Sequence, residues 1–490
     1  MEGLAKNFKP LQFFSEKKNH PYSLLPFRFI EIEEKKYLLS NEVGEFLIVD
    51  RGQLESFVQK RLNSSMSLYH DLKSKHFLLD DDSNVALDLL VLKYRTKAQR
   101  LSSFTSLHLF VVTLRCDYHC TYCQVSRQTK EKTKFDMTLE TADRALSQVF
   151  RSPSPTIKIE FQGGEPLLNF SLIRHIVEKS KKLNISENRD IQYVIATNLT
   201  YLDDEIMDFC LKHDIYLSTS LDGPADLHNI NRPRPDRDGF SLTVQNIQRA
   251  QRILGKDKIS ALMTTTEASL ARVKEIVDTY IELGFEGIFL RPISPYGFAI
   301  KTREAGKYNV ERWLSFYKEG LEYILNINRS GFRFVEHYTA VLLTKLFSPF
   351  ASGYVDLQSP SGIGIGAIAY NYDGDVYASD EARMLAEMGD KTFRLGNIHN
   401  NSYEEILSSD ILLNTLEDSI AESCPQCSEC GFLSYCGSDP VYHHASQGDV
   451  IGHKPSSAFC LRQMGMLKHL VLLWEKDPEA RDLMMRWIQP

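Results

Sequence analysis

Six strand-like segments alternate with helical segments across the middle of the chain, and this alternation restricts the fold more than any other feature. The strand-like segments lie at 107–113, 157–161, 191–196, 215–220, 259–264 and 287–291. Helical patterns begin near Thr138, a good N-cap residue, and near Ser171, Asp203, Ser241 and Ala268. Consecutive strand–helix units form parallel sheets with right-handed crossovers. We therefore predict an α/β fold, a partial (β/α)6 barrel whose functional residues follow the carboxyl ends of the strands.

Three cysteines follow directly on the first predicted strand. Cys116, Cys120 and Cys123 are separated by three and then two residues. Three thiolates on such a loop can hold three irons of a [4Fe–4S] cluster and leave the fourth iron open, whereas structural zinc sites fill all four positions. The alternative interpretation is three buried thiols or half of a zinc site.

The later strand ends carry glycines and polar residues. Gln162-Gly163-Gly164-Glu165-Pro166 follows the second strand, and two glycines allow a backbone to approach a ligand closely. Asn198 follows the third strand and Ser220 the fourth, and Arg232 comes shortly after. The alternative for each is an ordinary turn or a solvated charge run.

The cysteine loop, the Gly-Gly-Glu-Pro segment and the Ser-Leu-Asp-Gly segment that begins at Ser220 together resemble the radical S-adenosylmethionine (SAM) superfamily. The resemblance implies that the open iron chelates SAM. It implies further that SAM is held by Gly163, Gly164, Glu165 and Pro166 at its amino group, by Asn198 at its ribose, by Ser220 and Arg232 at its carboxylate, and by Tyr122 near its adenine. Arginine suits a carboxylate because its planar fork donates two parallel hydrogen bonds.

A second group of cysteines lies near the C-terminus. Cys427, Cys430 and Cys436, followed by the distant Cys460, resemble the SPASM extension of radical SAM peptide maturases, which usually binds two auxiliary clusters. Two clusters need about eight thiolates, and Ser379 and Pro440 stand where that family writes cysteine. We therefore predict one auxiliary [4Fe–4S] cluster, with Cys424 as an alternative ligand.

A zinc site is the rival interpretation of the same cysteines. Cys424, Cys427, Cys430 and Cys436 would supply four ligands, and spare ligands are available in His443, His444 and His453. Sequence spacing alone does not separate zinc from an iron–sulfur cluster.

The first hundred residues are rich in strands and then helical. Segments 27–33, 36–40 and 45–49 alternate like strands, and helical patterns follow at 51–61 and 66–74. This order resembles the small winged-helix domains that recognise the leaders of ribosomally made precursor peptides, and such a domain would bind a leader as an added strand. The alternative is a cap over the barrel. The basic stretch 93–100 would be the linker.

Length and composition set the remaining limits. A chain of 490 residues has room for several domains, and we predict four parts: 1–100, the leader-recognition domain; 101–310, the barrel; 311–360, a helical bridge; and 361–490, a SPASM-like domain. The net charge of −7 does not indicate a nucleic-acid partner. No apolar run reaches about 18 residues, and the N-terminus has no signal-peptide core. We expect a cytoplasmic protein without a membrane partner, in which thiols stay reduced.

Within the superfamily the chain resembles the B-component maturases of His-Xaa-Ser peptide systems. The residues concerned are Leu25-Pro-Phe-Arg-Phe, Cys123-Gln-Val-Ser-Arg-Gln, Tyr370-Asn-Tyr-Asp-Gly-Asp, and Cys436-Gly-Ser-Asp-Pro-Val with Gln447-Gly-Asp. The resemblance implies a radical enzyme that abstracts hydrogen from a precursor peptide bound through its leader. It also implies an electron donor such as flavodoxin or ferredoxin, a second maturase as a further partner, and Asp380 as a base.

Two other functions stay open at this point. One keeps the fold and changes the substrate to that of a sulfatase maturase or a small-molecule radical SAM enzyme. The other is a zinc-binding scaffold whose cysteines are structural.

Overall fold

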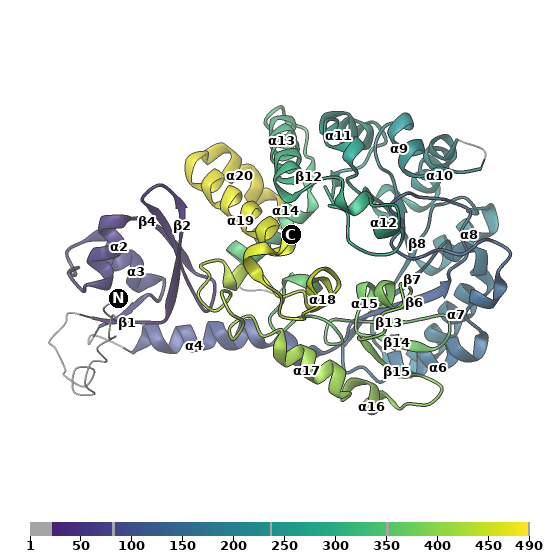
Figure 1. Cartoon of the computed structure of the whole chain (residues 1–490), viewed down its shortest axis with the longest axis horizontal. Helices are drawn as coiled ribbons and strands as arrows, with labels where there is room; N and C mark the ends of the chain where they lie inside the picture. The colour runs from purple at the N-terminus through teal and green to yellow at the C-terminus, as the bar shows by residue number, and fades with distance from the viewer. Residues whose placement is uncertain (1–21, 81–83, 236–237, 349–351, 489–490) are drawn as a thin grey trace, which may run out of the picture. The chain divides into compact units, whose positions relative to one another are not determined.

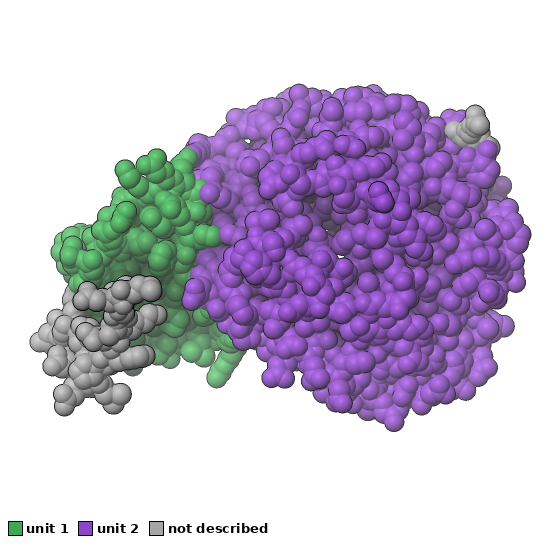
Figure 2. Space-filling view, in the orientation of Figure 1, with its two compact units in different colours: residues 1–95 green, residues 96–490 purple. Residues whose placement is uncertain are grey.

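The computed structural model describes residues 22–80, 84–235, 238–348 and 352–488. The chain divides into two compact units, residues 1–95 and 96–490 (Figure 2). The prediction that the N-terminus is no signal peptide concerns the first 21 residues, which lie outside the described residues. Among the residues that are described, no helix has both the length and the apolar character needed to cross a bilayer.

Unit 1 has a three-stranded antiparallel sheet with two helices. The strands are β2 (Phe27–Glu33), β3 (Lys36–Asn41) and β4 (Phe46–Asp50), in that order across the sheet, as predicted. Helices α2 (Arg51–Val58) and α3 (Ser67–Ser74) follow, and a short pair joins β1 (Ser23–Leu24) to β5 (Leu78–Leu79). Asp50 begins α2 with a capping box to Gln53. The buried side chains of Leu39, Phe57 and Leu72 form the core.

The stretch predicted as a linker is helical in the structure. Helix α4 spans Val85–Ala98 and the short α5 spans Arg100–Ser103. No residue of α4 is buried. The stretch is helical because its residues are mostly good helix formers without an interior glycine or proline, and its role as a linker stays a prediction.

Unit 2 contains the predicted parallel strands. They are β6 (Leu107–Thr113), β7 (Thr156–Gly163), β8 (Asp190–Ala196), β9 (Ile215–Ser220) and β10 (Ile259–Leu262), each parallel to the next. The helices between them lie around the outside of the strands (Figure 1). They are α6 (Leu139–Val149), α7 (Phe170–Glu187), α8 (Asp204–His213), α9 (Ala225–Asn231), α10 (Gly239–Leu254) and α11 (Val273–Glu282).

Alternation along β7 separates the helix-facing side of the barrel from its interior. Ile157, Ile159 and Phe161 are buried, whereas the side chains between them, Lys158 and Glu160, line the cavity described below. Because successive strand residues point to opposite faces, the interior of the barrel carries polar side chains at this strand.

The sixth predicted strand, 287–291, is the main difference in the barrel. Strand β11 has only two residues, Gly287–Ile288, and pairs with β12 (Val335–Glu336) in a separate two-stranded sheet. The buried Glu336 carboxylate accepts the N–H of Leu290 at 3.0 Å, and Pro292 has no N–H to donate. A side chain therefore replaces the strand partner, and only a single bridge, Thr265–Pro292, continues the barrel.

The C-terminal region extends the same sheet on the other side. Strand β13 (Ala367–Tyr370) pairs in parallel with β6, and β14 (Asp375–Tyr377) and β15 (Arg394–Asn397) complete an eight-stranded sheet. The predicted glycine turn is present, with Gly374 at φ +86°. The remaining helices are α12 (Phe298–Lys301), α13 (Val310–Arg329), α14 (His337–Phe347), α15 (Asp380–Ala386), α16 (Tyr403–Leu407), α17 (Asp410–Asp418), α18 (Pro440–Gln447), α19 (Ala458–Lys476) and α20 (Pro478–Trp487).

Candidate active site

A cavity of about 550 Å³ opens among the carboxyl ends of the barrel strands. Most of the predicted site residues line it, from loops that are far apart in the sequence. These are Cys116, Cys120, Tyr122, Cys123, Gly163, Gly164, Asn198, Ser220, Arg232 and Asp380. Glu165 and Pro166 are buried behind it. The structure therefore brings the predicted residues together at one end of the barrel.

The three loop thiols are neighbours. Burial, and then the nearby Cys120, raise the pKa of Cys116. The pKa of Cys120 is raised to about 11, chiefly by burial and also by Cys123, although Arg232 opposes the rise. The loop is fixed by the Cys116 amide, which donates to Gln128 O at 3.0 Å. Among the described residues, no three ligand-type side chains converge on one metal ion. Three neighbouring thiols are the protein donors that a multi-iron cluster uses, because each thiolate binds a different iron.

Gly163 and Gly164 allow the turn after β7 to pack closely against the backbone that leads into Cys116. Gly164 N donates to Thr113 O at 2.9 Å and Glu165 N to Arg115 O at 2.7 Å. A Cβ on Gly163 would lie 1.9 Å from Thr113 O, and one on Gly164 would lie 2.4 Å from Arg115 O. The turn after β7 is therefore pressed against the segment that leads into Cys116, and it still faces the cavity.

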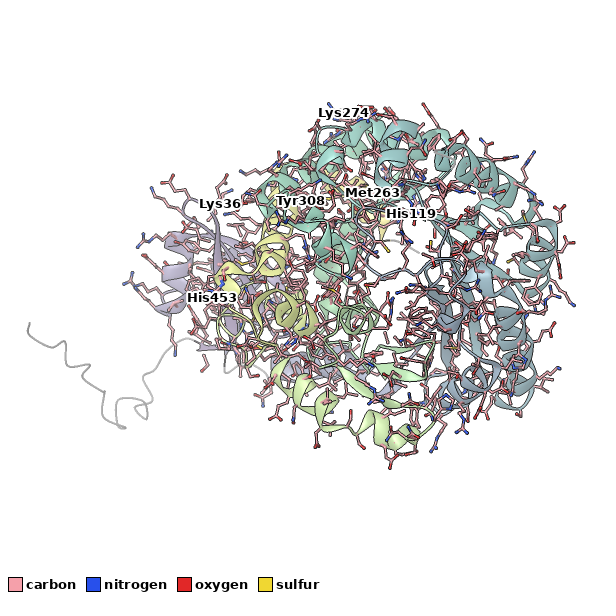
Figure 3. All side chains as sticks on the ribbon, turned by 45° about the vertical axis from the view of Figure 1, so that its right-hand side comes forward. Lys36, His119, Met263, Lys274, Tyr308 and His453 are labelled. Atoms are coloured by element: carbon pink, nitrogen blue, oxygen red, sulfur yellow. The ribbon has the colours of Figure 1, made fainter. Side chains whose placement is uncertain are left out.

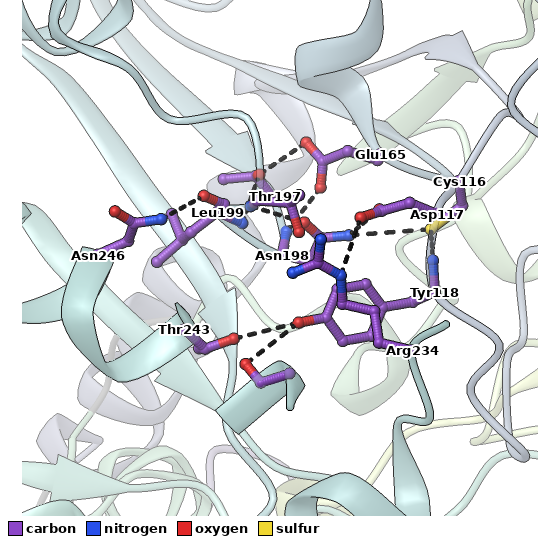
Figure 4. A network of polar contacts seen from close by, with 12 residues as sticks. Cys116, Asp117, Tyr118, Glu165, Thr197, Asn198, Leu199, Arg234, Thr243 and Asn246 are labelled. Carbon is purple, nitrogen blue, oxygen red and sulfur yellow. Dashed lines mark hydrogen bonds and ion pairs between the residues drawn. The ribbon is translucent and has the colours of Figure 1, made fainter. Parts of the chain in front are cut away.

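Glu165 organises the end of β8 (Figure 4). Its carboxylate, which is 0% exposed, accepts from Thr197 Oγ1 at 2.7 Å and from the Asn198 and Leu167 amides at 2.7 and 2.9 Å. Burial raises its pKa to about 7 although these three donors favour the ionised form. The Asn198 side chain then donates to Asp117 Oδ1 at 2.9 Å, one residue beyond Cys116. Glu165 thus connects the turn after β7 to the cysteine loop through Asn198.

Tyr122 connects Arg232 to a buried carboxylate, Asp222, that the sequence did not single out. The Tyr122 hydroxyl lies 2.9 and 2.7 Å from the two carboxylate oxygens of Asp222, to which it donates, and it accepts from Arg232 at 2.9 Å. Asp222 is fully buried, and burial raises its pKa. Arg232 is therefore oriented at the cavity through a tyrosine and not directly by a carboxylate.

Asp380 is held by an ion pair. Its Oδ1 lies 2.5 Å from a guanidinium nitrogen of Arg383, whose side chain is completely buried. Ser379, where the resembling family writes cysteine, caps α15 through the Ala382 amide. The aspartate thus faces the cavity in a fixed position at the start of a helix.

Sequence reasoning missed a polar group beside Asp380. Glu381, Asp356 and Arg291 line the same cavity. Burial, and then a neighbouring carboxylate, raise the pKa of both Glu381 and Asp356. Adjacency to Asp380 was the only sequence signal for Glu381, and the other two carried none.

The C-terminal cysteines form a second group. The pKa of Cys436 is raised to about 12 and that of Cys460 to about 11, in each case chiefly by burial and in part by the nearby Cys430. Cys427 also acts on Cys460. Cys424 instead donates its thiol to Asp418 O at 3.2 Å. The four thiols expected to hold an auxiliary cluster are therefore neighbours, and Cys424, the alternative ligand, lies close enough to Cys427 for that thiol to raise its pKa.

The histidines of the rival zinc site have other partners. His443 contacts Asp439 O and Ser457 Oγ at 2.7 and 2.9 Å through its two ring nitrogens. His444 contacts Asp390 at 2.8 Å and His453 contacts Ser456 at 2.8 Å. These contacts give the spare histidine ligands other partners, and they do not bear on a zinc site made of the four cysteines alone.

Comparison with known proteins identifies the barrel. Residues 110–295 match the model of the Radical SAM superfamily. The uncharacterized protein MJ0907 of Methanocaldococcus jannaschii is 34% identical over 191 residues, 38% of this chain and 63% of that protein, so the chain spans a little under two thirds of this relative. A cysteine-type anaerobic sulfatase-maturating enzyme of Clostridium perfringens is 25% identical over 330 residues, 64% of this chain and 83% of that enzyme.

Solved structures share the fold. The structure described as native anSMEcpe with bound AdoMet has a TM-score of 0.62 at 20% identity, covering 78% of this chain and 99% of that chain. Streptococcus suis SuiB bound to precursor peptide SuiA has a TM-score of 0.53 at 15% identity, covering 89% of this chain and 99% of that chain. Residues 110–295 therefore match a superfamily whose members use a [4Fe–4S] cluster and SAM. The loop thiols and the cavity beside them fit these groups.

Proposed function

We propose that this radical SAM enzyme modifies a ribosomally made precursor peptide by hydrogen abstraction, and that the peptide is of the His-Xaa-Ser repeat type. The observation that carries the activity is the cysteine loop, which opens into a cavity lined by Gly163, Gly164, Asn198 and Arg232. Cys116, Cys120 and Cys123 would hold a [4Fe–4S] cluster, and that group would supply one electron for the reductive cleavage of SAM.

The residues of the chain position the reactants. Arg232, oriented by Tyr122, offers a cation to the SAM carboxylate, and Asn198, held by Glu165, offers an amide to the ribose. Asp380 is placed to accept a proton from the substrate.

Unit 1 supports a peptide substrate. Among the strands that the structure describes, β2 lies at an edge of its sheet beside β3, and its Phe29 is 49% exposed. An extended leader can add to such an edge through main-chain hydrogen bonds. The SuiB structure, whose partner is a precursor peptide, covers 89% of this chain, whereas the anSMEcpe structure covers 78%. A sulfatase-maturase-like substrate is the second candidate, favoured by the 25% identity to the C. perfringens enzyme.

Cys427, Cys430, Cys436 and Cys460 would hold one auxiliary [4Fe–4S] cluster in this proposal. Iron, sulfide and zinc analysis after anaerobic reconstitution tests it, on wild type and on the Cys116/Cys120/Cys123→Ala variant. We expect about eight irons per chain, falling to about four in the variant. About four irons in wild type and none in the variant, with zinc retained, would assign the C-terminal cysteines to zinc. No iron in either protein would refute the activity.

The substrate class is tested with synthetic peptides on the full chain. When a His-Xaa-Ser repeat peptide with its leader is incubated with enzyme, SAM and dithionite, its mass should decrease because hydrogen is lost. The same repeat peptide without its leader should react much more slowly. Reaction with a sulfatase-derived peptide alone would favour the second candidate.

A further inference from the structure

The outer surface of the cysteine loop is covered by a short segment around α12. Phe298 N donates to Cys123 O at 2.6 Å, and Thr302 Oγ1 donates to Thr121 O at 2.8 Å. Gly297 approaches the same backbone so closely that a Cβ would lie 2.4 Å from Gln124 O. The segment 297–303 therefore packs directly on the residues between Cys120 and Cys123, both of which are partly exposed.

Basic and apolar side chains gather on this segment. The Arg127 guanidinium lies 5.8 Å from the centre of the Phe298 ring and the Lys301 ammonium lies 5.2 Å from it. Lys301 and Arg303 are exposed, and Ile300 is 44% exposed. We call Phe298, Ile300, Lys301 and Arg303, together with Arg127, which also lines the cavity, the basic collar.

The charge of the collar is opposite to that of the whole protein. The chain carries a net charge of −7, yet the collar holds three cations. The acidic residue next to it, Glu304, is paired with Lys307 at 2.5 Å. A small apolar centre with charged residues around it is the composition of a surface that binds a protein transiently, and complementary charge speeds such encounters.

We propose that the basic collar is the docking surface for a small acidic protein that delivers one electron to the group held by the cysteine loop. The carrier is oxidised by one electron and that group is reduced by one. The collar lies over the backbone of Thr121 and Cys123, so a carrier docked there is separated from the metal ligands only by this segment. The proposal rests on the proposed function, because only a reductively activated enzyme needs this electron.

The test is a double charge reversal, Lys301→Glu with Arg303→Glu, in the reconstituted full chain. Neither side chain lines the cavity. The matched control reverses two exposed lysines on outer helices, Lys182→Glu on α7 with Lys274→Glu on α11. Lys274 lies well apart from His119 of the cysteine loop (Figure 3). Both doubly reversed proteins have the same net charge.

The probe is a purified bacterial flavodoxin. Binding of oxidised flavodoxin at low salt should weaken by about tenfold or more in the collar variant, and its dependence on ionic strength should flatten. SAM cleavage driven by reduced flavodoxin should slow to a similar extent, while cleavage driven by dithionite stays within about twofold of wild type. The control variant should behave as wild type in every arm.

The binding and cleavage measurements distinguish failure of the docking surface from failure of the proposed function. Equal flavodoxin binding by the collar variant and wild type, or equal loss in the control variant, would overturn the docking surface. Absence of SAM cleavage with dithionite in wild type would instead refute the proposed function. If the double variant loses iron, Lys301→Gln with Arg303→Gln replaces it, and unchanged flavodoxin binding by that variant also overturns the proposal.

Discussion

The substitution Thr197→Val tests whether Glu165 organises the active site. It keeps the shape of a buried side chain and removes one hydroxyl. That hydroxyl donates to Glu165 Oε1 at 2.7 Å and accepts from Leu199 N at 2.9 Å. The change therefore deletes one charge-assisted hydrogen bond and leaves one amide without its partner.

The two lost contacts set the size of the expected decrease in the free energy of unfolding. A hydrogen bond to a charged group contributes about 1.5–3 kcal/mol, and an unsatisfied buried donor costs about 1–3 kcal/mol. Because neighbouring groups relax, we expect the free energy of unfolding of Thr197→Val to fall by about 3 kcal/mol at pH 8.

The stability lost in Thr197→Val should depend on pH, because Glu165 changes its charge between acid and neutral pH. The pKa of Glu165 is raised from 4.5 to about 7, so between these values the folded chain holds a proton that the unfolded chain has released. The stability contributed by this group therefore falls as the pH rises from 4.5 to about 7 and is constant above. Below about pH 6 the deleted bond is a neutral one, worth about 1 kcal/mol. The difference between wild type and variant should accordingly shrink to about 2 kcal/mol at pH 5.

Urea denaturation of the metal-free chain at pH 5 and pH 8 measures this difference. The matched control is Thr200→Val, because the Thr200 hydroxyl is buried and makes no hydrogen bond within the described structure. The control should lose less than about 0.5 kcal/mol at either pH. A Thr197→Val loss as small as that of the control, or one that is independent of pH, would refute the reasoning.

Three further changes test other parts of the site. Gly297→Ala puts a Cβ 2.4 Å from Gln124 O at φ +58°, so reconstituted iron at the loop should fall by at least half, whereas Gly448→Ala, at φ +73° with open space around it, should keep its iron. Tyr122→Phe removes the donor to Asp222 and the acceptor of Arg232; calorimetry should show SAM binding about tenfold weaker, a loss of about 1.4 kcal/mol, and unchanged affinity would exclude the orienting role. Asp380→Asn should keep 5′-deoxyadenosine formation and lower peptide product by about 100-fold. If Glu381→Gln shows that pattern instead, Glu381 is the base.

Local sequence patterns were enough for most of the barrel. Five predicted strands and the helices after them are present because alternating burial and N-cap residues such as Thr138 and Asp203 act within a few residues. The sixth predicted strand did not form over its full length, because a contact between residues far apart in the sequence replaces its strand partner. The Glu336 carboxylate, 46 residues away, takes the Leu290 N–H that a strand neighbour would have bound.

The sequence by itself determined which thiols lie together in each loop, since spacings of two and three residues fix them within one turn. It did not determine what holds the site together. The Tyr122–Asp222 contact spans 100 residues and the Glu165–Asn198 contact spans 33. Cys460 joins Cys427 and Cys430 only through the start of α19. Such contacts depend on strand order and on how elements pack, and no local period records them, so only the tertiary structure decided which polar groups support the cysteine loop.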